Sequence, residues 1–300
     1  MSRPLRWDTD GRDWPNRHAS RFVRAGAITW HVQQTGEGPL VLLLHGTGAS
    51  THSWRDLMPL LAQTMNVIAP DLPGHGFTCG RPARGLTLAG IADAVSDLMD
   101  ALECELGLVI GHSAGVAIAM QCALSGRSSS PIVGLNPAIM PFAGLAAQLA
   151  PAMARVLFLN PFMPRIFART ARVPGQTAQF LRRSTGSQID AGGLHYYETL
   201  FGNAAHCRGV LEMMANWDLA GFSRRLPEMG NPLLLIHSEG DRAIPLDSVR
   251  QAALRLPDCR LEILARLGHL AHEEDPQQIV RLILGYAQEQ GLFQGEGGTP

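Results

Sequence analysis

The chain has 300 residues, of which 46% are hydrophobic and 17% are charged, and its formal net charge is −1. These values are ordinary for one globular domain with an insertion, so the chain can bury a core without disulfides or a structural metal. The nearly neutral charge gives no sign of a nucleic-acid partner, and we expect none.

The five cysteines are odd in number and scattered, and no two of them form a C-x-x-C pair. They indicate neither a disulfide framework nor a zinc ribbon, which favours a reducing compartment. The N-terminal region carries Asp8, Asp10 and Asp13 among several arginines, where a signal peptide needs an uninterrupted apolar run. We therefore expect a cytoplasmic protein.

In chain order, residues 1–20 are predicted to form an N-terminal extension, and residues 22–34 a strand hairpin. Segments with helical periodicity then alternate with strand-like segments near 40–45, 66–70, 106–110, 132–135, 233–238 and 260–264. This alternation predicts an α/β fold with a mostly parallel sheet and helices on both faces.

The alternation breaks between about Pro137 and Pro227, where helical patterning dominates. We interpret residues 137–227 as a helical cap inserted into a core of residues 21–136 and 228–290, and residues 291–300 as a flexible tail. Nine arginines against four acidic residues give the cap a net charge of +5, which leaves −6 for the rest of the chain. This asymmetry could steer an anionic substrate or face an acidic membrane surface, and a solvated helical surface is the alternative.

The first part of the cap, residues 138–154, carries no charge, but prolines interrupt it too often for a membrane-spanning helix. One interpretation is a lid over a large apolar ligand that also touches the bilayer interface. The other is packing between the cap and the core.

The segment Gly111-His112-Ser113-Ala114-Gly115 follows a strand-like run and precedes an apolar helical stretch. A G-x-S-x-G sequence in this context is typical of a nucleophile elbow, in which small neighbours permit the sharp turn that exposes a serine. We predict that Ser113 is a nucleophile.

Serine needs a base, and after such an elbow the partners follow in the order acid, then histidine. Asp241 follows the apolar run 233–236, and His269 follows the run 261–264, so both are predicted at strand ends. Asp241 could instead be a turn residue, with Glu239 as the acid. His269 and His272 have a spacing compatible with a metal, but no further Cys/His cluster accompanies them, and we expect no metal site.

Acyl transfer also needs backbone amides that face the developing negative charge. The glycine-rich turn after residues 40–44 and the elbow predict these donors at Thr47 and Ala114. His45 is expected to organise this turn and is a candidate for the substrate pocket together with Trp54 and Phe142. Trp54 could equally anchor the helix that follows the turn. Neither a P-loop nor a G-x-G-x-x-G motif is present, which disfavours nucleotide binding.

These motifs stand in the order of the α/β-hydrolase superfamily, which the chain resembles through residues 45–48, 71–76, 111–115, 240–241 and 268–269. Longer strings resemble the magnesium chelatase accessory proteins of bacteriochlorophyll biosynthesis at residues 20–26, 45–57, 213–219 and 268–274. The resemblance extends over about residues 14–286. It implies an α/β-hydrolase fold with a cap and a place in tetrapyrrole metabolism, and with it contact with a magnesium chelatase subunit and a peripheral position at the photosynthetic membrane.

We therefore expect a serine hydrolase with no cofactor, in which Ser113, His269 and Asp241 act on an ester of an apolar or tetrapyrrole-like small molecule. Epoxide hydrolases and haloalkane dehalogenases of similar outline need aspartate at the elbow, so Ser113 argues against them. Carbon–carbon bond hydrolases use serine and remain an alternative. A non-catalytic protein that binds a porphyrin or assists the chelatase is the other alternative.

Overall fold

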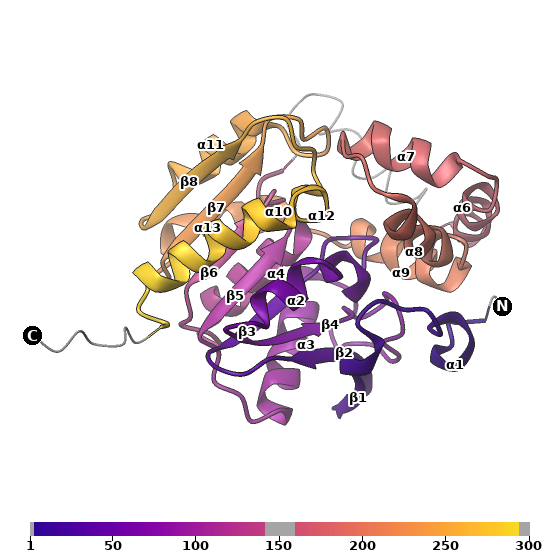
Figure 1. Cartoon of the computed structure of the whole chain (residues 1–300), viewed down its shortest axis with the longest axis horizontal. Helices are drawn as coiled ribbons and strands as arrows, with labels where there is room; N and C mark the ends of the chain where they lie inside the picture. Colours follow the sequence, from indigo (N-terminus) through magenta and orange to yellow (C-terminus); the bar gives the residue numbers. More distant parts are fainter. Residues whose placement is uncertain (1–2, 142–159, 294–300) are drawn as a thin grey trace, which may run out of the picture.

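The fold is built on one eight-stranded sheet in a computed structural model that describes residues 3–141 and 160–293 (Figure 1). The strand order is β1-β2-β4-β3-β5-β6-β7-β8; the β1–β2 and β2–β4 pairs are antiparallel, and the other pairs are parallel. The strands are β1 Ser20–Ala25, β2 Ile28–Thr35, β3 Leu40–Leu44, β4 Asn66–Pro70, β5 Leu108–His112, β6 Ile132–Leu135, β7 Leu233–Ser238 and β8 Cys259–Leu264. The predicted hairpin and mostly parallel sheet are therefore confirmed.

The central strands are apolar because both of their faces are covered. Alternate residues of β3 belong to different apolar clusters, with Leu42 and Leu44 in one cluster and Val41 and Leu43 in the other. Since successive side chains of a strand point to opposite faces, the sheet has a core on each side. This explains why the strands read as continuous apolar runs rather than as an alternating pattern.

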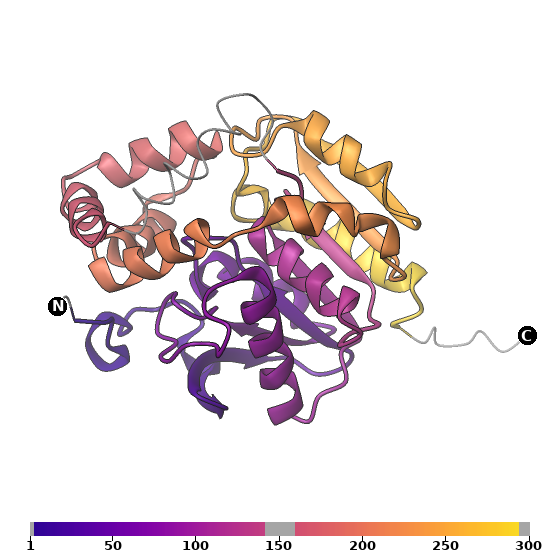
Figure 2. The same cartoon turned by 180° about the vertical axis from the view of Figure 1, so that it is seen from behind.

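Helices cover the two faces unequally (Figures 1 and 2). The helices α2 (Leu57–Leu61) and α13 (Pro276–Glu289) contribute to the apolar cluster on one face. The cluster on the other face includes apolar residues of α3 (Leu88–Ala101), α4 (Ala114–Leu124), α10 (Leu219–Arg224) and α11 (Leu246–Ala253). The apolar residues of α3 form a buried stripe, as expected for an amphipathic helix.

A separate group of helices stands beside the sheet, at the end where the parallel strands finish (Figure 1). Its members are α6 (Met163–Ala171), α7 (Gln176–Thr185), α8 (Ala191–Phe201) and α9 (Ala204–Ala215). They interrupt the chain between β6 and β7, as the predicted cap does. The next two elements in the predicted cap range, α10 and the 3-10 helix η3 (Leu226–Glu228), place Leu219, Phe222 and Leu226 in the core cluster instead.

The two ends of the chain pack differently from the simple extension and tail that the sequence suggests. The short α1 (Trp7–Asp10) and η1 (Arg17–Ala19) precede β1, and buried Trp14 donates through its indole N–H to Thr51 Oγ1 (3.0 Å). At the other end, Leu292 and Phe293 pack against the apolar cluster of α13. The rest of the predicted flexible tail, residues 294–300, lies outside the described residues.

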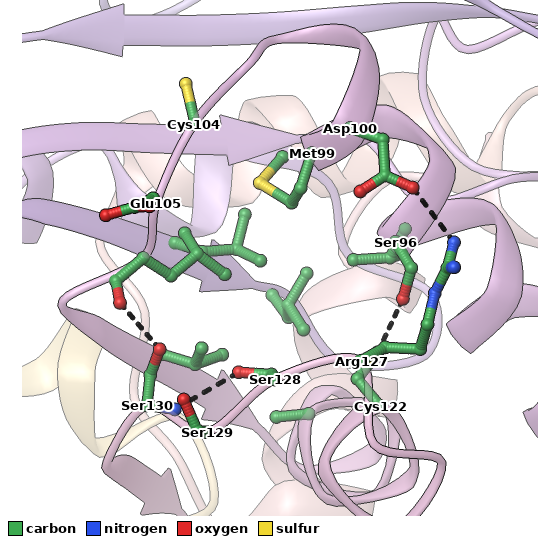
Figure 3. A pocket seen from close by; sticks show the side chains of 16 residues that line it. Ser96, Met99, Asp100, Cys104, Glu105, Cys122, Arg127, Ser128, Ser129 and Ser130 are labelled. Atoms are coloured by element: carbon green, nitrogen blue, oxygen red, sulfur yellow. Dashed lines mark hydrogen bonds and ion pairs between the residues drawn. The ribbon is translucent and has the colours of Figure 1, made fainter.

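A cavity of about 420 Å³ lies between the sheet and the helices α3 and α4, near the starts of β5 and β6 (Figure 3). Leu42 and Val109 line its apolar floor, and Arg127 lies at its polar rim, where its guanidinium pairs with Asp100 (3.0 Å). Ser113 is not among its lining residues. This cavity is therefore separate from the predicted active site.

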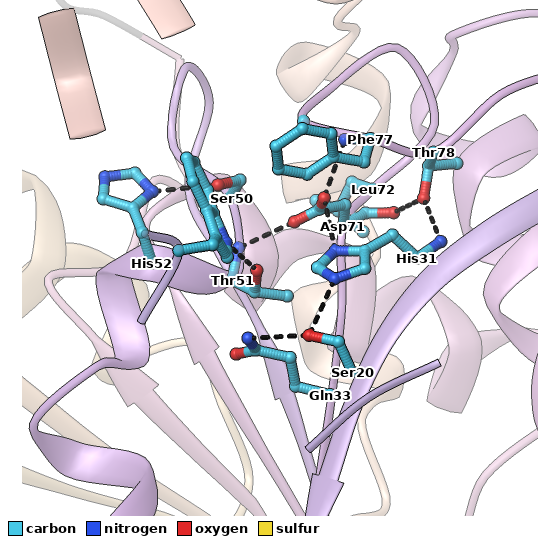
Figure 4. A network of polar contacts seen from close by, with 12 residues as sticks. Ser20, His31, Gln33, Ser50, Thr51, His52, Asp71, Leu72, Phe77 and Thr78 are labelled. Carbon is cyan, nitrogen blue, oxygen red and sulfur yellow. Dashed lines mark hydrogen bonds and ion pairs between the residues drawn. The ribbon is translucent and has the colours of Figure 1, made fainter. Parts of the chain in front are cut away.

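Asp71 forms the centre of a buried polar network that joins three segments (Figure 4). Its carboxylate accepts hydrogen bonds from the His31 ring on β2, the Thr51 amide and the Phe77 amide, each at 2.8 Å. Burial by itself would raise the pKa of this carboxyl, but the charge and hydrogen bond of His31 bring the pKa below its ordinary value. Next to it, Gly76 has a φ of +49°, and a Cβ there would overlap the carboxylate. Asp71 thus braces the loop after β4.

Replacement of Asp71 by asparagine is expected to destabilise the fold by about 3 kcal/mol, because an amide group would face donors that now meet a carboxylate oxygen. Urea unfolding of the two proteins measures this loss. Asp93→Asn is the matched control, since the Asp93 side chain is about half exposed and, among the described residues, forms an ion pair only with exposed Arg84; it should change stability by less than about 0.5 kcal/mol. Equal effects of the two substitutions would contradict the bracing role.

Candidate active site

Ser113 occupies a strained turn between β5 and α4. Its backbone has a φ of 51° and a ψ of −113°, in a region that residues with a side chain rarely adopt. A Cβ at Gly115 would overlap the Leu44 carbonyl, and a Cβ at Gly111 would lie 2.5 Å from the Val116 amide nitrogen. The two glycines of the motif are therefore needed for close packing of strand and helix, as the elbow pattern predicts.

Asp241 and His269 form a direct hydrogen-bonded pair. The Nδ1–H of His269 donates to Asp241 Oδ2 over 2.7 Å, and the side-chain amide of Asn136 donates to the same oxygen over 2.9 Å. The Ala243 and Ile244 amides donate to Asp241 Oδ1 at 2.7 and 2.9 Å. Burial acts to raise the pKa of Asp241, but the hydrogen bond and charge of His269 outweigh it, and the pKa lies below its ordinary value. The acid is thus held as a carboxylate that orients the imidazole.

The alternative acid, Glu239, is exposed, whereas Asp241 is hydrogen-bonded to the His269 ring. Sequence spacing leaves both choices open, because the two residues are two positions apart in one loop.

The loop of His269 is joined to the elbow by the residue that precedes the serine. His112 Nε2–H donates to the His269 carbonyl over 2.9 Å, and the centroids of the two rings are 4.8 Å apart. Among the hydrogen bonds of residues 3–141 and 160–293, none joins the Ser113 hydroxyl to the His269 ring. Such bonds commonly become short only when substrate binds. The structure brings the three predicted residues into one region, but Ser113 and His269 are not hydrogen-bonded to each other.

The two segments that carry the predicted oxyanion donors, the turn after β3 and the start of α4, approach each other closely at the serine. A Cβ built on Gly46, the residue before Thr47, would be 3.1 Å from Ser113 Cβ. Neither the Thr47 nor the Ala114 amide donates to another backbone group in the described part of the chain. Ala114 is also the first residue of α4, where the helix leaves its N–H groups unpaired and favours negative charge. Both amides are therefore available to an incoming oxyanion.

His45 and Trp54 do not lie where a pocket role requires them. His45 is fully buried; its Nδ1–H donates to the Gly46 carbonyl (2.8 Å), and its Nε2 accepts from the Leu72 amide (2.9 Å). Burial lowers the pKa of His45, so the ring is neutral and both nitrogens are occupied. Trp54, at the end of the 3-10 helix η2 (Thr51–Trp54), is fully buried in the cluster of α2. We assign both to support of the glycine-rich turn at residues 45–48, the candidate oxyanion turn, rather than to substrate contact.

The third pocket candidate, Phe142, lies outside the described residues.

Two cap side chains reach the oxyanion turn instead. A Cβ on Gly48 would be 3.3 Å from Cε1 of Phe201 at the end of α8. Met213 on α9 is fully buried, and its sulfur lies 3.9 Å from the Thr47 hydroxyl oxygen. Both come from helices about 150 residues further along the chain, so local sequence pattern gave no signal for Phe201. They form an apolar wall beside the candidate oxyanion site.

A buried polar chain connects the cap to α12 (Ala271–Glu274), directly after His269. Tyr197 on α8 donates its hydroxyl to Glu273 Oε1 (2.7 Å), and the Ser53 hydroxyl donates to the same oxygen (2.8 Å). The Ser53 oxygen lies 2.7 Å from His272 Nε2, which then acts as the donor. The ring of His272 packs against that of His112 at 4.4 Å between centroids. His272 therefore has a structural place in this chain, beside the His269 loop.

Glu273 gives the protein a distinctive pH dependence. Burial raises the pKa of its carboxyl from 4.5 to about 7, although hydrogen bonds from Tyr197 and Ser53 act in the opposite direction. The folded state holds this proton more tightly than the unfolded chain does. The protonated Glu273 carboxyl therefore contributes fully to the free energy of unfolding below pH 4.5, and this contribution is lost as the pH rises to about 7. The shift corresponds to about 3 kcal/mol.

Glu273→Gln should remove this dependence, because the amide oxygen can still accept from Tyr197 and Ser53 but does not titrate. Urea unfolding at pH 5 and pH 8 should show the wild type losing up to about 3 kcal/mol more stability than the variant. The comparison with the variant is needed because buried neutral histidines such as His272 have the opposite effect. Burial lowers their pKa, so the folded protein loses stability at low pH, where these rings must take up a proton. Glu262→Gln is the control, because the Glu262 side chain is about half exposed. Parallel profiles for wild type and Glu273→Gln would contradict the assignment.

The sheet order, the elbow and the helices inserted between β6 and β7 together define the α/β-hydrolase fold. Residues 41–282 match the model of the alpha/beta hydrolase family, and the chain belongs to this family. It is 39% identical over 278 residues to the magnesium-chelatase 30 kDa subunit of Rhodobacter capsulatus, a match that covers 92% of this chain and 97% of the relative.

Two further comparisons agree with this placement. The chain is 31% identical over 261 residues to the pimeloyl-[acyl-carrier protein] methyl ester esterase of Aromatoleum aromaticum, covering 79% of this chain and 94% of that one. The crystal structure of an alpha/beta hydrolase fold protein from Burkholderia ambifaria superposes with a TM-score of 0.73 at 21% identity, covering 95% of this chain and 100% of that chain. In the described part of the chain, no helix has the length and apolar character needed to cross a membrane.

Proposed function

We propose that this protein is a serine hydrolase that cleaves an ester, with Ser113 as nucleophile, His269 as general base and Asp241 as the acid that orients it. The observation that carries the proposal is the buried 2.7 Å pair of His269 and Asp241 beside a serine in an elbow conformation. The relationship to a methyl ester esterase supports the choice of ester over other acyl substrates.

The chemistry follows from this arrangement. His269 Nε2 accepts the proton of the Ser113 hydroxyl as the serine oxygen attacks the ester carbonyl. The Thr47 and Ala114 amides stabilise the negative charge on the carbonyl oxygen. The imidazolium, held by Asp241, then protonates the departing alkoxide, and a water molecule activated by the same histidine releases the acid and restores the serine.

An active-serine fluorophosphonate probe tests the nucleophile directly. Purified protein should gain the mass of one phosphonyl group, mapped to Ser113, and should hydrolyse short p-nitrophenyl esters; Ser113→Ala should do neither. Intact-mass spectrometry and release of p-nitrophenol give the two readings. If the wild type is not labelled and turns over no ester, the hydrolase assignment fails.

We place this activity in tetrapyrrole metabolism, because the relative from Rhodobacter capsulatus is named as a magnesium-chelatase subunit. The same relationship favours a second candidate function, in which the chain binds a porphyrin or a chelatase subunit without catalysis. A Rhodobacter capsulatus strain that lacks the relative distinguishes the two. If this chain restores pigment and Ser113→Ala does not, catalysis is required; if both restore it, the accessory function holds.

The cap surface supports a peripheral contact with an anionic partner, for which we propose the membrane surface. Phe162, Ile166, Val173 and Phe180 are exposed on or beside α6 and α7. Residues 160–189 contain five exposed arginines and no acidic residue. Exposed aromatic and aliphatic side chains among cationic ones are typical of surfaces that lie at the interface of an anionic bilayer.

A further inference from the structure

One turn of the cap lies in backbone contact with both loops of the candidate acid–base pair. This turn, Thr185–Ser187, begins at the last residue of α7 and has Gly186 at its centre with a φ of +77°. A Cβ on Gly186 would overlap the Gly240 carbonyl, beside Asp241, and a Cβ on Gly268 would overlap Ser187, beside His269. The close approach therefore depends on glycine on each side.

Hydrogen bonds fix the turn to the two loops. The Thr185 carbonyl accepts from the amide of His269 itself (2.9 Å) and from the amide of Arg242, the residue after the acid (3.3 Å). The Ser187 hydroxyl oxygen accepts from the Leu270 amide (2.8 Å). One turn of the cap thus binds the base residue, its neighbour and the neighbour of the acid.

These contacts are sheltered from water. Thr185 and Ser187 are buried, with 8% and 2% of their surfaces exposed, so water does not compete for the bonds. The acid and base loops are also joined to each other, because the Gly240 amide donates to the Leu267 carbonyl (3.0 Å). A shift of the turn would therefore move both loops relative to Ser113.

We propose that the Thr185–Ser187 turn positions the Asp241–His269 pair for catalysis, with Ser187 as a positioning residue that acts through the Leu270 amide. The inference rests on the proposed hydrolase function and assigns to the cap a part in catalysis beyond covering the substrate. Small displacements at a reacting centre have large effects, since a misplacement of about 1 Å can lower a rate about a hundredfold.

The test compares Ser187→Ala, Ser187→Thr and Ser184→Ala in p-nitrophenyl ester hydrolysis. Ser187→Ala should lower kcat about tenfold to a hundredfold and change KM by less than about twofold, because the substrate contacts remain. Ser187→Thr keeps the oxygen acceptor and should restore most of kcat. Ser184→Ala is the matched control, since the Ser184 hydroxyl donates to the carbonyls of Phe180 (2.8 Å) and Leu181 (3.5 Å) within α7, and it should match the wild type.

A spectroscopic reading separates positioning from simple stabilisation. In protein with ¹⁵N-labelled histidine, the Nδ1 proton shared with Asp241 should give a far-downfield resonance, identified by its loss in Asp241→Asn. Ser187→Ala should shift or broaden this resonance. If Ser187→Ala lowers only the unfolding midpoint and leaves both kcat and the resonance unchanged, the positioning role is overturned.

The two proposals can fail separately. A wild type that shows no labelling and no turnover refutes the hydrolase function, and the resonance alone then decides whether the turn positions the pair. Its persistence in Ser187→Ala overturns the inference, and its change supports it.

Discussion

Ser113→Ala is expected to lower kcat for p-nitrophenyl esters by at least about ten-thousandfold. The alanine has no oxygen to form the acyl-enzyme, whereas the backbone amides of Thr47 and Ala114, the proposed oxyanion donors, are unchanged. A small residual rate above that of water should therefore persist, and KM should change little. Stopped assays at high enzyme concentration measure both quantities.

The control is Ser125→Ala at the opposite end of α4. Ser125 is exposed, and within residues 3–141 and 160–293 its hydroxyl accepts a hydrogen bond only from the Gln121 side chain, over 2.9 Å. This variant should retain wild-type kcat and KM. Turnover that survives in Ser113→Ala at more than about a hundredth of the wild-type rate would show that another group is the nucleophile.

Asp241→Asn is expected to lower kcat about ten-thousandfold with little change in KM. At present all four donors that meet this side chain point at carboxylate oxygens: the His269 ring, the Asn136 amide and the Ala243 and Ile244 amides. An asparagine must direct its NH₂ group at two of them. If that group faces His269, the imidazole must carry its proton on Nε2, where it can no longer accept the serine proton.

Two measurements accompany this prediction. Glu239→Gln, two residues away and exposed, serves as the control and should keep full activity. The fluorophosphonate probe should label Asp241→Asn far more slowly than the wild type, although Ser113 is intact. Equal labelling of the two proteins would mean that Asp241 does not set the state of His269, and Glu239 would need to be tested as the acid.

The sequence by itself predicted the sheet and the elbow, because both depend on local pattern. Apolar runs such as Leu40–Leu44 are continuous only when both faces of a strand are buried, so their spacing along the chain already indicates a parallel sheet. Gly111 and Gly115 around Ser113 indicate a turn that is too tight for larger residues at these two positions. Because β5, β7 and β8 are parallel, their carboxyl ends lie at one edge of the sheet, and Ser113, Asp241 and His269 follow these ends.

The tertiary structure alone decided which side chains meet at that edge. The sequence favours Asp241 and leaves Glu239 as the alternative acid, and only the path of the loop places Asp241 against His269. Trp54 reads equally well as a pocket residue or as a core residue until its indole is found fully buried under the sheet. The contacts of Ser187 with the His269 loop join residues about 80 positions apart.

The physical reason is the range of the interactions. Strand and elbow patterns arise from interactions between residues a few positions apart. The side-chain periodicity and the backbone strain involved depend on the local sequence and can be recognised in it. Hydrogen bonds between the cap and the catalytic loops depend instead on how two separately formed helix groups dock, and many residue pairs could satisfy the same donors and acceptors. The sequence therefore determined the sheet and where the reactive groups stand along it, and the docking of the cap determined how they are held.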